Sequence, residues 1–334
     1  MKFTIPKNFF KNKTIFITGG TGSFGKNMVN HLLKNYKNLQ KIIIYSRDEL
    51  KQFEMANNFS LKENEKLRFF IGDVRDGHRL KTAMENVDYV FHAAALKQVP
   101  SSEYNPFETI KTNIIGSQNV IESALENNVN KVLALSTDKA SSPYNLYGAT
   151  KLCADKLFIA ANNVRGKRKI SFSVLRYGNV FGSRGSVVET FAKSKKRNIF
   201  NIADKRMTRF NITIEEAIER ALYALYISQG EEIIVPKLPS YRILDLVEAI
   251  RPNAKINITG IRPGEKLNEE LISINNAPNT VEIKNFYIIL NYKSGNTAKY
   301  YKNKHNSKIV KDFFSYTSDR NESFLSVNQI KKLL

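Results

Sequence analysis

Short apolar runs alternate with helical patterns over the first half of the chain. Such runs lie at residues 14–18, 41–45, 67–71, 88–92, 132–135 and 170–176. They are rich in β-branched and aromatic residues and show little polar alternation, which is typical of strands buried on both faces. Helical patterns separate them, for example over 26–35 and 106–128. This alternation predicts an α/β fold with a doubly wound parallel sheet and right-handed crossovers.

A glycine-rich turn joins the first predicted strand to the first predicted helix. It reads Gly19-Gly20-Thr21-Gly22-Ser23-Phe24-Gly25. Glycines at this place let the backbone approach a pyrophosphate at the N-terminus of the helix. A glycine triplet alone is weak evidence, but its position between strand and helix predicts a dinucleotide-binding, Rossmann-type sheet. Ligands of such sheets bind at the carboxyl ends of the strands, where this chain places Gly20, Arg47, Asp73, Lys97 and Thr137.

The residues after the second predicted strand bear on the choice of cofactor. An acidic residue at this strand end often binds the ribose 2′-hydroxyl of NAD. Here Ser46 and Arg47 end the strand and Lys51 follows. These side chains suit a 2′-phosphate, so the sequence favours NADP. Asp48 is a counter-argument, unless its side chain caps the helix that begins there.

A tyrosine and a lysine four residues apart follow the fifth predicted strand. Tyr147 and Lys151 share one face of a helix, and Thr137 ends the strand before them. A tyrosine titrates near pH ~10, and a lysine beside the phenol favours the phenolate, so the pair could accept a proton from an alcohol. Asp138 and Lys139 add an acid and a second base. Such residues more often form only a helix face and a turn, but the glycine turn favours the catalytic interpretation.

Composition narrows the class of protein. The chain has 334 residues, 42% of them hydrophobic, which is ordinary for a globular protein of one large domain or two. No run approaches the about 18 apolar residues of a membrane span, and the N-terminus lacks the apolar core of a signal peptide. The only cysteine is Cys153. We therefore expect a cytoplasmic protein without an intrachain disulfide.

The net charge of +21, from 52 basic and 31 acidic residues, is consistent with more than one kind of anionic partner. Nucleic acid is one, but the lysines are scattered and no recognition-helix, zinc-finger or RNA-binding pattern is present. An anionic small ligand such as a nucleotide is also consistent. The four histidines lie too far apart in the chain for a metal-site spacing. We expect neither a nucleic-acid partner nor a metal.

The second half of the chain predicts a smaller region that covers the substrate. We divide the chain into a dinucleotide-binding domain that carries the catalytic residues, 10–180, and a mainly substrate-binding region with a C-terminal extension, 181–334, which may return to the core sheet. Two arginine-containing loops suit a diphosphate clamp, although solvated surface charge explains them better when they are taken alone; they lie at 206–210 and 260–266. The last segments predict a polar loop or extension and a capped terminal helix, at 291–308 and 324–334.

Together these motifs resemble an extended short-chain dehydrogenase/reductase. The stretches that carry a closer match are 18–25, 46–51, 136–140, 145–151 and 262–267. They resemble the short, soluble UDP-N-acetylglucosamine 4,6-dehydratases that invert C5 and begin pseudaminic acid synthesis for flagellin and surface glycans. The resemblance covers roughly residues 12–275 and implies NADP as cofactor and UDP-N-acetylglucosamine as substrate.

The resemblance implies roles for five catalytic residues. Tyr147, tuned by Lys151 and helped by Thr137, takes the proton of the sugar 4-hydroxyl while hydride leaves C4 for NADP. Lys139 then removes the C5 proton, and Asp138 protonates the departing 6-hydroxyl. Hydride returns to C6 and a proton returns to C5 from the opposite face. The adjacent Lys139 would lower the pKa of Asp138, which opposes the role of Asp138 as an acid.

The resemblance also implies two sets of binding residues. The cofactor set is Gly19, Thr21, Gly22, Ser23, Phe24, Gly25, Ser46, Arg47, Lys51, Asp73, Val74, Ala93, Ala95, Lys97, Ser136, Thr137, Tyr147, Lys151 and Val180. The sugar-nucleotide set is Lys97, Asn179, Arg184, Gly185, Ser186, Val187, Val188, Arg209, Arg262 and Glu265.

Three residues depart from the expected pattern, and the resemblance also bears on assembly. Gln98 and Asn268 stand where histidines are expected, and Asn211 stands where an aromatic residue is expected. The departures affect substrate packing rather than the proposed chemistry. The helices that carry Asn113 and Tyr147 are expected to form a dimer bundle, so we expect a homo-oligomer, a dimer or a hexamer.

Three other functions remain open at this point. A UDP-sugar 4-epimerase and a capsule-pathway dehydratase with 3,5-epimerase activity are close alternatives. The pair Asp138 and Lys139 argues against a simple epimerase, which needs no extra acid and base for loss of water. A non-catalytic NADP-binding regulator on the same fold is the third, and intact Thr137, Tyr147 and Lys151 argue against it.

Overall fold

One sheet forms the centre of the protein. The computed structural model describes residues 3–183, 186–193, 199–291 and 295–334. In this described part of the chain, ten strands form the sheet in the order β15-β13-β14-β9-β6-β5-β4-β1-β2-β3. The strands from β9 to β3 in that order run parallel to their neighbours. The expected α/β fold with a doubly wound parallel sheet is confirmed.

Six parallel strands of the described chain lie within two residues of their predicted bounds. They are β1 (Thr14–Thr18), β2 (Lys41–Ser46), β3 (Leu67–Ile71), β4 (Tyr89–His92), β5 (Lys131–Thr137) and β6 (Ser171–Tyr177). A further parallel strand, β9 (Glu232–Pro236), was not predicted. β1, β4, β6 and β9 are buried at every position, because helices cover both faces of the sheet. This double burial explains why the strands appear in the sequence as continuous apolar runs.

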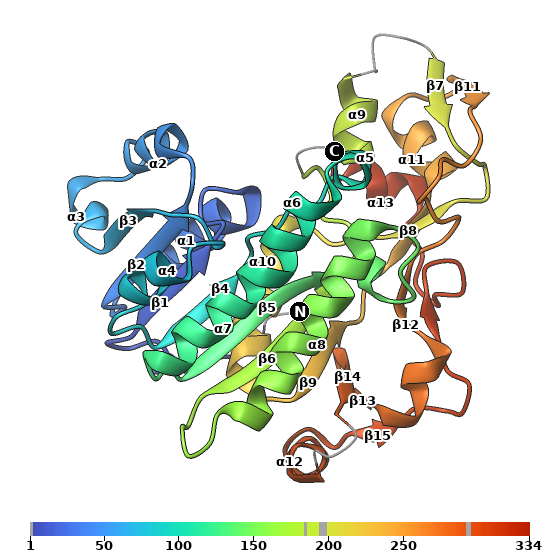
Figure 1. Ribbon diagram of the computed structural model, residues 1–334. Helices are drawn as coiled ribbons and strands as arrows, with labels where there is room; N and C mark the ends of the chain where they lie inside the picture. The colour runs from blue at the N-terminus through green and yellow to red at the C-terminus, as the bar shows by residue number, and fades with distance from the viewer. Residues whose placement is uncertain (1–2, 184–185, 194–198, 292–294) are drawn as a thin grey trace.

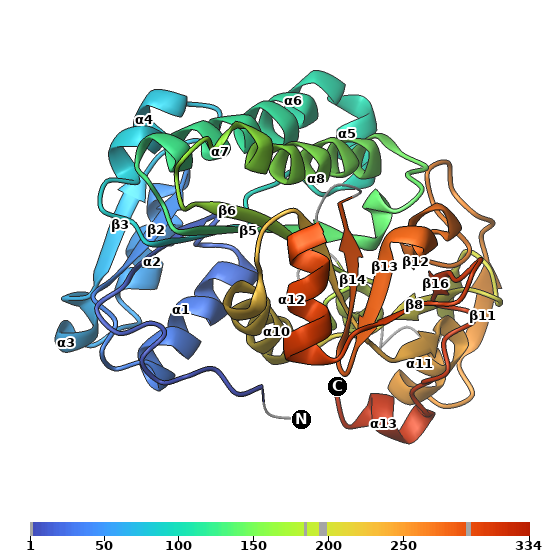
Figure 2. The same cartoon turned by 90° about the horizontal axis from the view of Figure 1, so that it is seen from below.

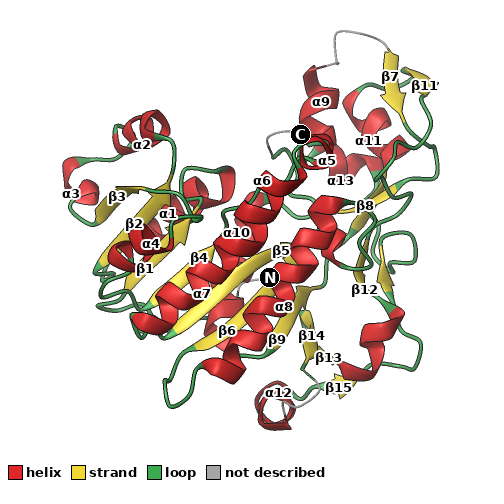
Figure 3. Cartoon of the chain, in the orientation of Figure 1, coloured by secondary structure: helices red, strands yellow, loops and turns green. Residues whose placement is uncertain are grey.

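Helices cover the sheet on both sides (Figures 1 and 2). Figure 3 shows α7 and α8 in front of the strands of the sheet. One face carries α4 (Gly77–Ala83), α5 (Val99–Tyr104), α6 (Pro106–Ile110), α7 (Gly116–Glu126) and α8 (Leu146–Val164). The other carries α1 (Ser23–Asn35) and α10 (Ile214–Ile227), while α2 (Glu49–Ala56) and α3 (Leu61–Asn64) connect β2 to β3. A π-helical turn, Lys111–Ile115, joins α6 to α7, so the pattern over 106–128 is realised as one nearly continuous helical run.

The C-terminal part of the chain returns to the same sheet. A hairpin of β13 (Thr280–Ile283) and β14 (Phe286–Leu290) extends it in antiparallel fashion, and β15 (Lys308–Ile309) adds the edge. The expectation of a polar loop or extension over 291–308 missed a helix there, α12 (Gly295–His305). Tyr301 is fully buried on this helix. Because the other side chains of α12 are mostly polar, no apolar period marked it in the sequence.

A second apolar cluster lies beside the end of the main sheet. It centres on Phe200, Tyr241 and Leu246. The elements that contribute to it are α9 (Val187–Lys193), β7 (Ile199–Ile202), β10 (Ser240–Arg242), α11 (Ile243–Ile250), β11 (Lys255–Ile258) and α13 (Val327–Lys331). β8 (Thr208–Phe210) pairs with β10, and β12 (Glu270–Ile272) pairs with β16 (Tyr316–Thr317); the buried apolar side chains of β8, β12 and β16 belong to the main core. The 3-10 helix Ile274–Asn279 follows β12.

The chain ends in a short helix, and the described helices were also compared with the length and hydropathy that a membrane span requires. The expected capped terminal helix is confirmed as α13, because Ser326 and Gln329 form a capping box at its start. Within the described residues, no helix is long and apolar enough to cross a membrane.

Candidate active site

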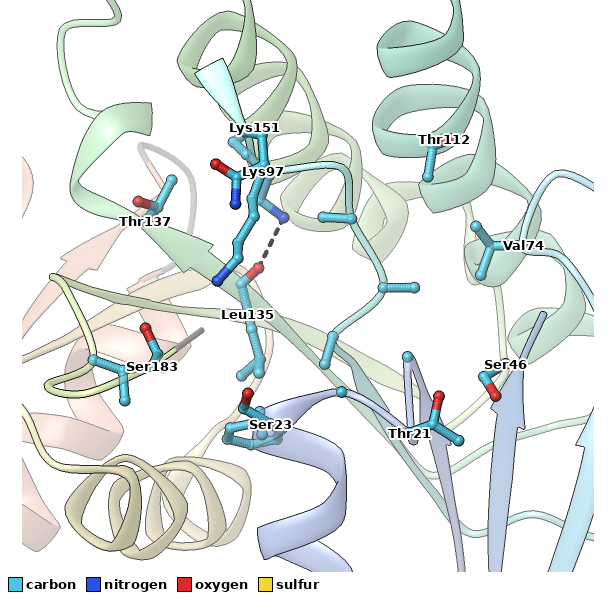
Figure 4. Close-up of a pocket in the computed structure, with 18 of the residues that line it drawn as sticks. Thr21, Ser23, Ser46, Val74, Lys97, Thr112, Leu135, Thr137, Lys151 and Ser183 are labelled. Carbon is cyan, nitrogen blue, oxygen red and sulfur yellow. Dashed lines mark hydrogen bonds between the residues drawn. The ribbon is translucent and has the colours of Figure 1, made fainter. Parts of the chain in front are cut away.

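A cleft of about 900 Å³ opens at the carboxyl ends of the parallel strands. It runs from the glycine turn between β1 and α1 to the ends of β5 and β6, and Ser186 before α9 reaches it from the second region. Figure 4 shows Thr137, Lys97 and Lys151 gathered toward one side of this cleft and Thr21, Ser46 and Val74 toward the other. The cleft is therefore elongated, with chemically different ends.

The glycine turn forms an open cradle at the N-terminus of α1. Gly22 is the N-cap, no side chain caps the helix, and its first turn has no acidic residue. The free N–H groups and the positive end of the helix dipole suit a phosphate. Gly19 has φ +66°, and a Cβ there would lie 3.0 Å from the backbone of Ala94. Gly25 does not line the cleft; a Cβ there would lie 2.3 Å from the Gly20 carbonyl oxygen, so this glycine lets α1 pack on the turn.

Polar residues after β2 and β3 form the end of the cleft farther from β5. Arg47 is largely exposed, and its Nη1 lies 3.8 Å from Asp73 Oδ2. Asp48 caps α2 by accepting a hydrogen bond of 3.0 Å from the Lys51 backbone N–H, and it also pairs with the Lys51 ammonium group. The counter-argument against NADP is therefore weakened, because the Asp48 carboxylate is engaged by its own helix. Ser46, Arg47, Lys51, Asp73 and Val74 all line the cleft.

Thr137, Tyr147 and Lys151 meet at the opposite end. The first turn of α8 and the last residue of β5 bring them to the same wall of the cleft. Lys151 is buried and donates a hydrogen bond of 2.8 Å to the Leu135 carbonyl oxygen. Burial raises the pKa of Tyr147 to about 12, while the charge of Lys139 and the Thr137 hydroxyl act to lower it. Lys139 is therefore one cation that acts on the phenol, and the role expected for Lys151 stays a prediction.

An ionic cluster of Lys139 and two buried carboxylates lies at the same end of the cleft. Lys139 Nζ donates to Asp138 Oδ1 at 3.1 Å and to Glu269 Oε1 at 3.2 Å. Thr137 Oγ1 also donates to Asp138 Oδ1, at 2.9 Å. Burial and the nearby Glu269 charge raise the pKa of Asp138 against the opposing effect of Lys139. This direction favours Asp138 as an acid.

The two carboxylates have the opposite effect on Lys139. Burial opposes its charge, but Asp138 and Glu269 together raise the pKa of Lys139 well above its usual range. Lys139 is therefore a cation in this structure. It lines the cleft, whereas the fully buried Asp138 lies behind it.

The expected sugar-nucleotide residues are not all brought to the cleft. Lys97, Asn179 and Ser186 line it, and the buried Asn179 Oδ1 has no hydrogen-bond partner among the described residues. Arg184 and Gly185 lie outside the described residues. The remaining expected residues do not line the cleft: Val187, Val188, Arg209, Arg262 and Glu265.

Two of these residues have other partners in the fold. Val188 belongs to the second apolar cluster. Arg209 is buried and donates to the carbonyl oxygens of Thr208 and Leu267 at 2.7 and 2.9 Å. Its guanidinium group is thereby turned toward the protein and not toward the cleft.

Several residues of the site were not singled out from the sequence. The expected cofactor residues other than Gly25 line the cleft, as does Gln98, which the sequence had marked as a departure, but so do Tyr45, Gly72, Ala94, Val99, Thr112, Leu135, Tyr177, Gly178 and Ile214. Most of them flank predicted residues on the same strand ends, so the strand-end rule could have found them. Glu269 had no such signal, because it lies 130 positions from Lys139. Within the described residues, no group of three or more His, Cys, Asp or Glu side chains could hold a metal.

Comparison with known proteins identifies the family. The model of the polysaccharide biosynthesis protein family matches residues 15–291. This chain belongs to that family. A relative from Campylobacter jejuni, UDP-N-acetylglucosamine 4,6-dehydratase (inverting), is 50% identical over 97% of this chain and 98% of its own length. The resemblance inferred from the motifs is therefore confirmed.

Two further similar proteins are a relative named as an epimerase and a solved structure. A UDP-glucose 4-epimerase from Rickettsia bellii is 40% identical over 97% of this chain and 96% of its own length. The X-ray structure of Pen from Bacillus thuringiensis superimposes with a TM-score of 0.87 at 36% identity, and covers 97% of this chain and 98% of that one. Dehydratase and epimerase names thus both occur among the relatives, and the residues of the cleft have to discriminate between them.

Proposed function

We propose that this protein is a UDP-N-acetylglucosamine 4,6-dehydratase that inverts C5 and yields UDP-2-acetamido-2,6-dideoxy-β-L-arabino-hexos-4-ulose. The observation that carries the proposal is the buried cluster of Asp138, Lys139 and Glu269 beside Tyr147. Loss of water needs an acid and a base in addition to the group that oxidises the alcohol. The relative named an inverting dehydratase, at 50% identity, supports the same assignment.

The cleft fits a dinucleotide cofactor. The uncapped N-terminus of α1 and the small residues Gly19, Ala93 and Ala95 would hold the pyrophosphate and admit its close approach. Arg47, with Ser46 and Lys51, would hold a 2′-phosphate. NADP bound there would take hydride from C4 of the sugar, return it to C6, and add a positive charge to the site while oxidised.

The residues of the chain would supply the proton transfers. Tyr147, supported by Thr137, takes the proton of the 4-hydroxyl. Lys139 removes the C5 proton, which the neighbouring ketone makes acidic, and Asp138 donates a proton to the departing 6-hydroxyl. The raised pKa of Asp138 suits this donation. To act as a base, Lys139 must lose a proton to the solvent of the cleft before hydride leaves C4, while the positive charge of the oxidised cofactor would favour that loss.

Proton NMR of UDP-N-acetylglucosamine incubated with the purified protein in deuterated water tests the function. The expected product is a 6-deoxy-4-keto sugar that is deuterated at C5 and has the L-arabino configuration. A keto product with retained C5 would keep the dehydratase assignment and remove the inverting one. Conversion to the 4-epimer alone would establish the epimerase alternative that the Rickettsia relative suggests. Tight NADP binding without turnover of any UDP-sugar would favour a regulator.

The preference for NADP has its own test through Arg47. Calorimetric titration is expected to show tighter binding of NADP than of NAD, and Arg47→Ala should weaken NADP binding by roughly 10- to 100-fold, since a bond to a charged group contributes about 1.5–3 kcal/mol. Arg75→Ala is the matched control, because Arg75 pairs with the same Asp73 at 2.7 Å but does not line the cleft. Equal affinity of the unmodified protein for NAD and NADP would contradict the preference.

The wider setting of the enzyme is also proposed. We place the reaction in the cytoplasm, as the first step of pseudaminic acid synthesis for flagellin or surface glycans, and expect the enzyme to be a hydro-lyase that acts as a dimer or a hexamer. The resemblance in the motifs supports the pathway, and apolar residues exposed on α5 and α6 support self-association.

A further inference from the structure

Glu269 reaches the reactive end of the cleft from a distant part of the chain. It directly precedes β12, where its backbone N–H donates to Ser318 Oγ at 2.9 Å and its carbonyl oxygen accepts from the Ser318 N–H at 2.8 Å. These bonds hold the backbone of Glu269 against the segment that leads from β16. The side chain is only 4% exposed, and its Oε1 accepts from Lys139 Nζ, which also donates to Asp138.

Lys139 is the shared partner of the two carboxylates. Its Nζ is nearly equidistant from Asp138 Oδ1, at 3.1 Å, and Glu269 Oε1, at 3.2 Å. The second oxygen of each carboxylate, Asp138 Oδ2 and Glu269 Oε2, is buried and has no hydrogen-bond partner among the described residues. A buried carboxylate oxygen without a donor is costly. A proton on one of the two carboxyl groups relieves that cost.

We propose that Glu269 is a positioning residue for the elimination of water: its carboxylate shares Lys139 with Asp138, so that Asp138 is not tied up as the sole partner of the ammonium group and keeps the proton that it donates. This inference rests on the proposed dehydratase function. In the elimination the C5–H bond breaks and its proton passes to Lys139. The electron pair forms the C5–C6 double bond, the C6–O bond breaks, and the Asp138 proton completes the water molecule. Asp138 ends as a carboxylate and Lys139 as an ammonium.

The Glu269 charge acts on both partners in the same direction. A negative charge nearby makes a carboxylic acid harder to ionise and an ammonium harder to deprotonate. Removal of that charge should therefore lower the pKa of Asp138 and the pKa of Lys139 together. The alkaline limb of the pH profile reports loss of the acid, and the acidic limb reports protonation of the base. Both limbs, which belong to the coupled group as a whole, should move to lower pH.

Other charged or titratable groups facing this cluster come from several elements of the described structure. Tyr147 comes from α8, Arg209 from β8, Tyr241 from β10, and Lys266 from the segment before β12. Arg209 Nε lies 3.6 Å from Glu269 Oε1 and keeps Glu269 ionised together with Lys139. Loss of the Glu269 carboxylate would leave Arg209 and Lys139 with fewer anionic partners, which adds to the downward movement of both limbs.

The test is the pH profile of keto-sugar formation for Glu269→Gln, a substitution that keeps the size of the side chain. The profile is expected to shift to lower pH by on the order of one unit, the scale of an opposite charge at this range. On a limb of unit slope this is about a tenfold loss of kcat above the optimum. The KM for the sugar nucleotide and the affinity for NADP should stay near the values of the unmodified protein, since Glu269 does not line the cleft.

Two further variants separate charge from structure. Glu269→Asp keeps the negative charge but places it farther from Lys139, so an intermediate shift of the pH profile is expected. If Glu269→Gln does not fold, the profile of Glu269→Asp tests the positioning role. Glu270→Gln is the matched control, because this neighbouring carboxylate accepts from Ser141 and Ser142 hydroxyls at 3.1 and 3.2 Å. Its profile should coincide with that of the unmodified protein.

The outcomes distinguish this inference from the proposed function. If the unmodified protein forms no keto sugar, the dehydratase function fails and the role of Glu269 fails with it. If it does, and Glu269→Gln gives a profile that is unshifted or is only lower at every pH, the positioning role alone is overturned. The same follows if Glu270→Gln shifts the profile as far as Glu269→Gln does.

Discussion

At the scale of single residues, the protonation states of Asp138 and Lys139 determine whether the reactive end of the cleft can eliminate water. Asp138, Lys139 and Glu269 form one buried group in which Lys139 is shared between two carboxylates. From the sequence, the adjacent Lys139 was expected to make Asp138 a poor acid. Burial and the second carboxylate reverse that expectation and raise the pKa of Asp138. The same two carboxylates stabilise the protonated form of Lys139, although Lys139 must lose a proton before it can act as a base.

Replacement of Lys139 tests that role directly. Lys139→Ala is expected to retain NADP binding and to lose keto-sugar formation by at least about 100-fold, the lower end of the contribution of a general base. NMR of the sugar product and a fluorescence titration of the cofactor measure the two properties. Lys34→Ala, a change of an exposed lysine on α1, is the matched control and should behave as the unmodified protein. Unchanged product formation by Lys139→Ala would remove Lys139 from the role of C5 base.

Sequence reasoning found the residues that lie near one another in the chain or at strand ends. Thr137, Asp138 and Lys139 are consecutive, and Tyr147 follows within one loop, so a strand end and a helix start suffice to bring them together. Glu269 could not be found in this way, because the contact with Lys139 depends on how the segment before β12 packs against the end of β5. The influence of Lys139 on Tyr147 likewise depends on side-chain positions, which spacing alone does not give.

At the scale of elements, helix α8 holds the catalytic turn through a close backbone contact. Gly148 lies in the first turn of α8, and a Cβ there would lie 2.3 Å from the Lys139 carbonyl oxygen. The N-cap Asn145 accepts from the Gly148 N–H at 2.8 Å and donates to the Gly264 carbonyl oxygen at 2.7 Å. The start of α8 thus joins the catalytic turn to the loop that carries Arg262 and Glu265.

We predict that Gly148→Ala separates α8 from the catalytic turn. The added methyl group has no room, and overpacking of this kind costs about 1–3 kcal/mol. The melting temperature should fall, and kcat should fall further than NADP affinity, because the displaced peptide carries Lys139. Gly295→Ala is the control, since a Cβ there meets nothing within 4 Å; its melting temperature should not fall. A Gly148→Ala protein with unchanged kcat would show that the contact is dispensable.

The elements that the sequence predicted well are those with a clear pattern of apolar residues. The parallel strands appear as apolar runs because both of their faces are covered, and their bounds were within two residues. Helix α12 was missed because it packs mainly through Tyr301 and exposes lysines and asparagines elsewhere. One buried aromatic side chain does not produce a helical period in the sequence.

At the scale of the whole molecule, the second half of the chain both covers the cleft and completes the sheet. β9 lies beside β6, and the hairpin of β13 and β14 extends the same sheet beyond it. The segment before β12 meanwhile brings Glu269 to the catalytic turn. The sequence allowed for this return but did not indicate which segments make it, because pairing of strands from distant parts of the chain leaves no local signal.

The surface of the helical layer on the α5 to α8 face predicts self-association. Tyr104, Phe107 and Ile115 are 86%, 63% and 49% exposed on α5, on α6 and on the π-helical turn that follows it. Large apolar side chains gathered on one face mark a protein interface. Light scattering during gel filtration is expected to give the mass of a dimer or a larger even-numbered oligomer.

Phe107→Glu tests whether this face holds the oligomer together. A charge placed in an apolar interface must be desolvated without a partner, so the variant should have a lower mass at the same concentration while its melting curve remains cooperative. Leu61→Glu is the matched control: Leu61 is 89% exposed on α3, at the opposite end of the sheet near β3, and its mass should equal that of the unmodified protein. A monomeric unmodified protein would contradict the predicted assembly, and an unchanged mass for Phe107→Glu would move the interface to another face.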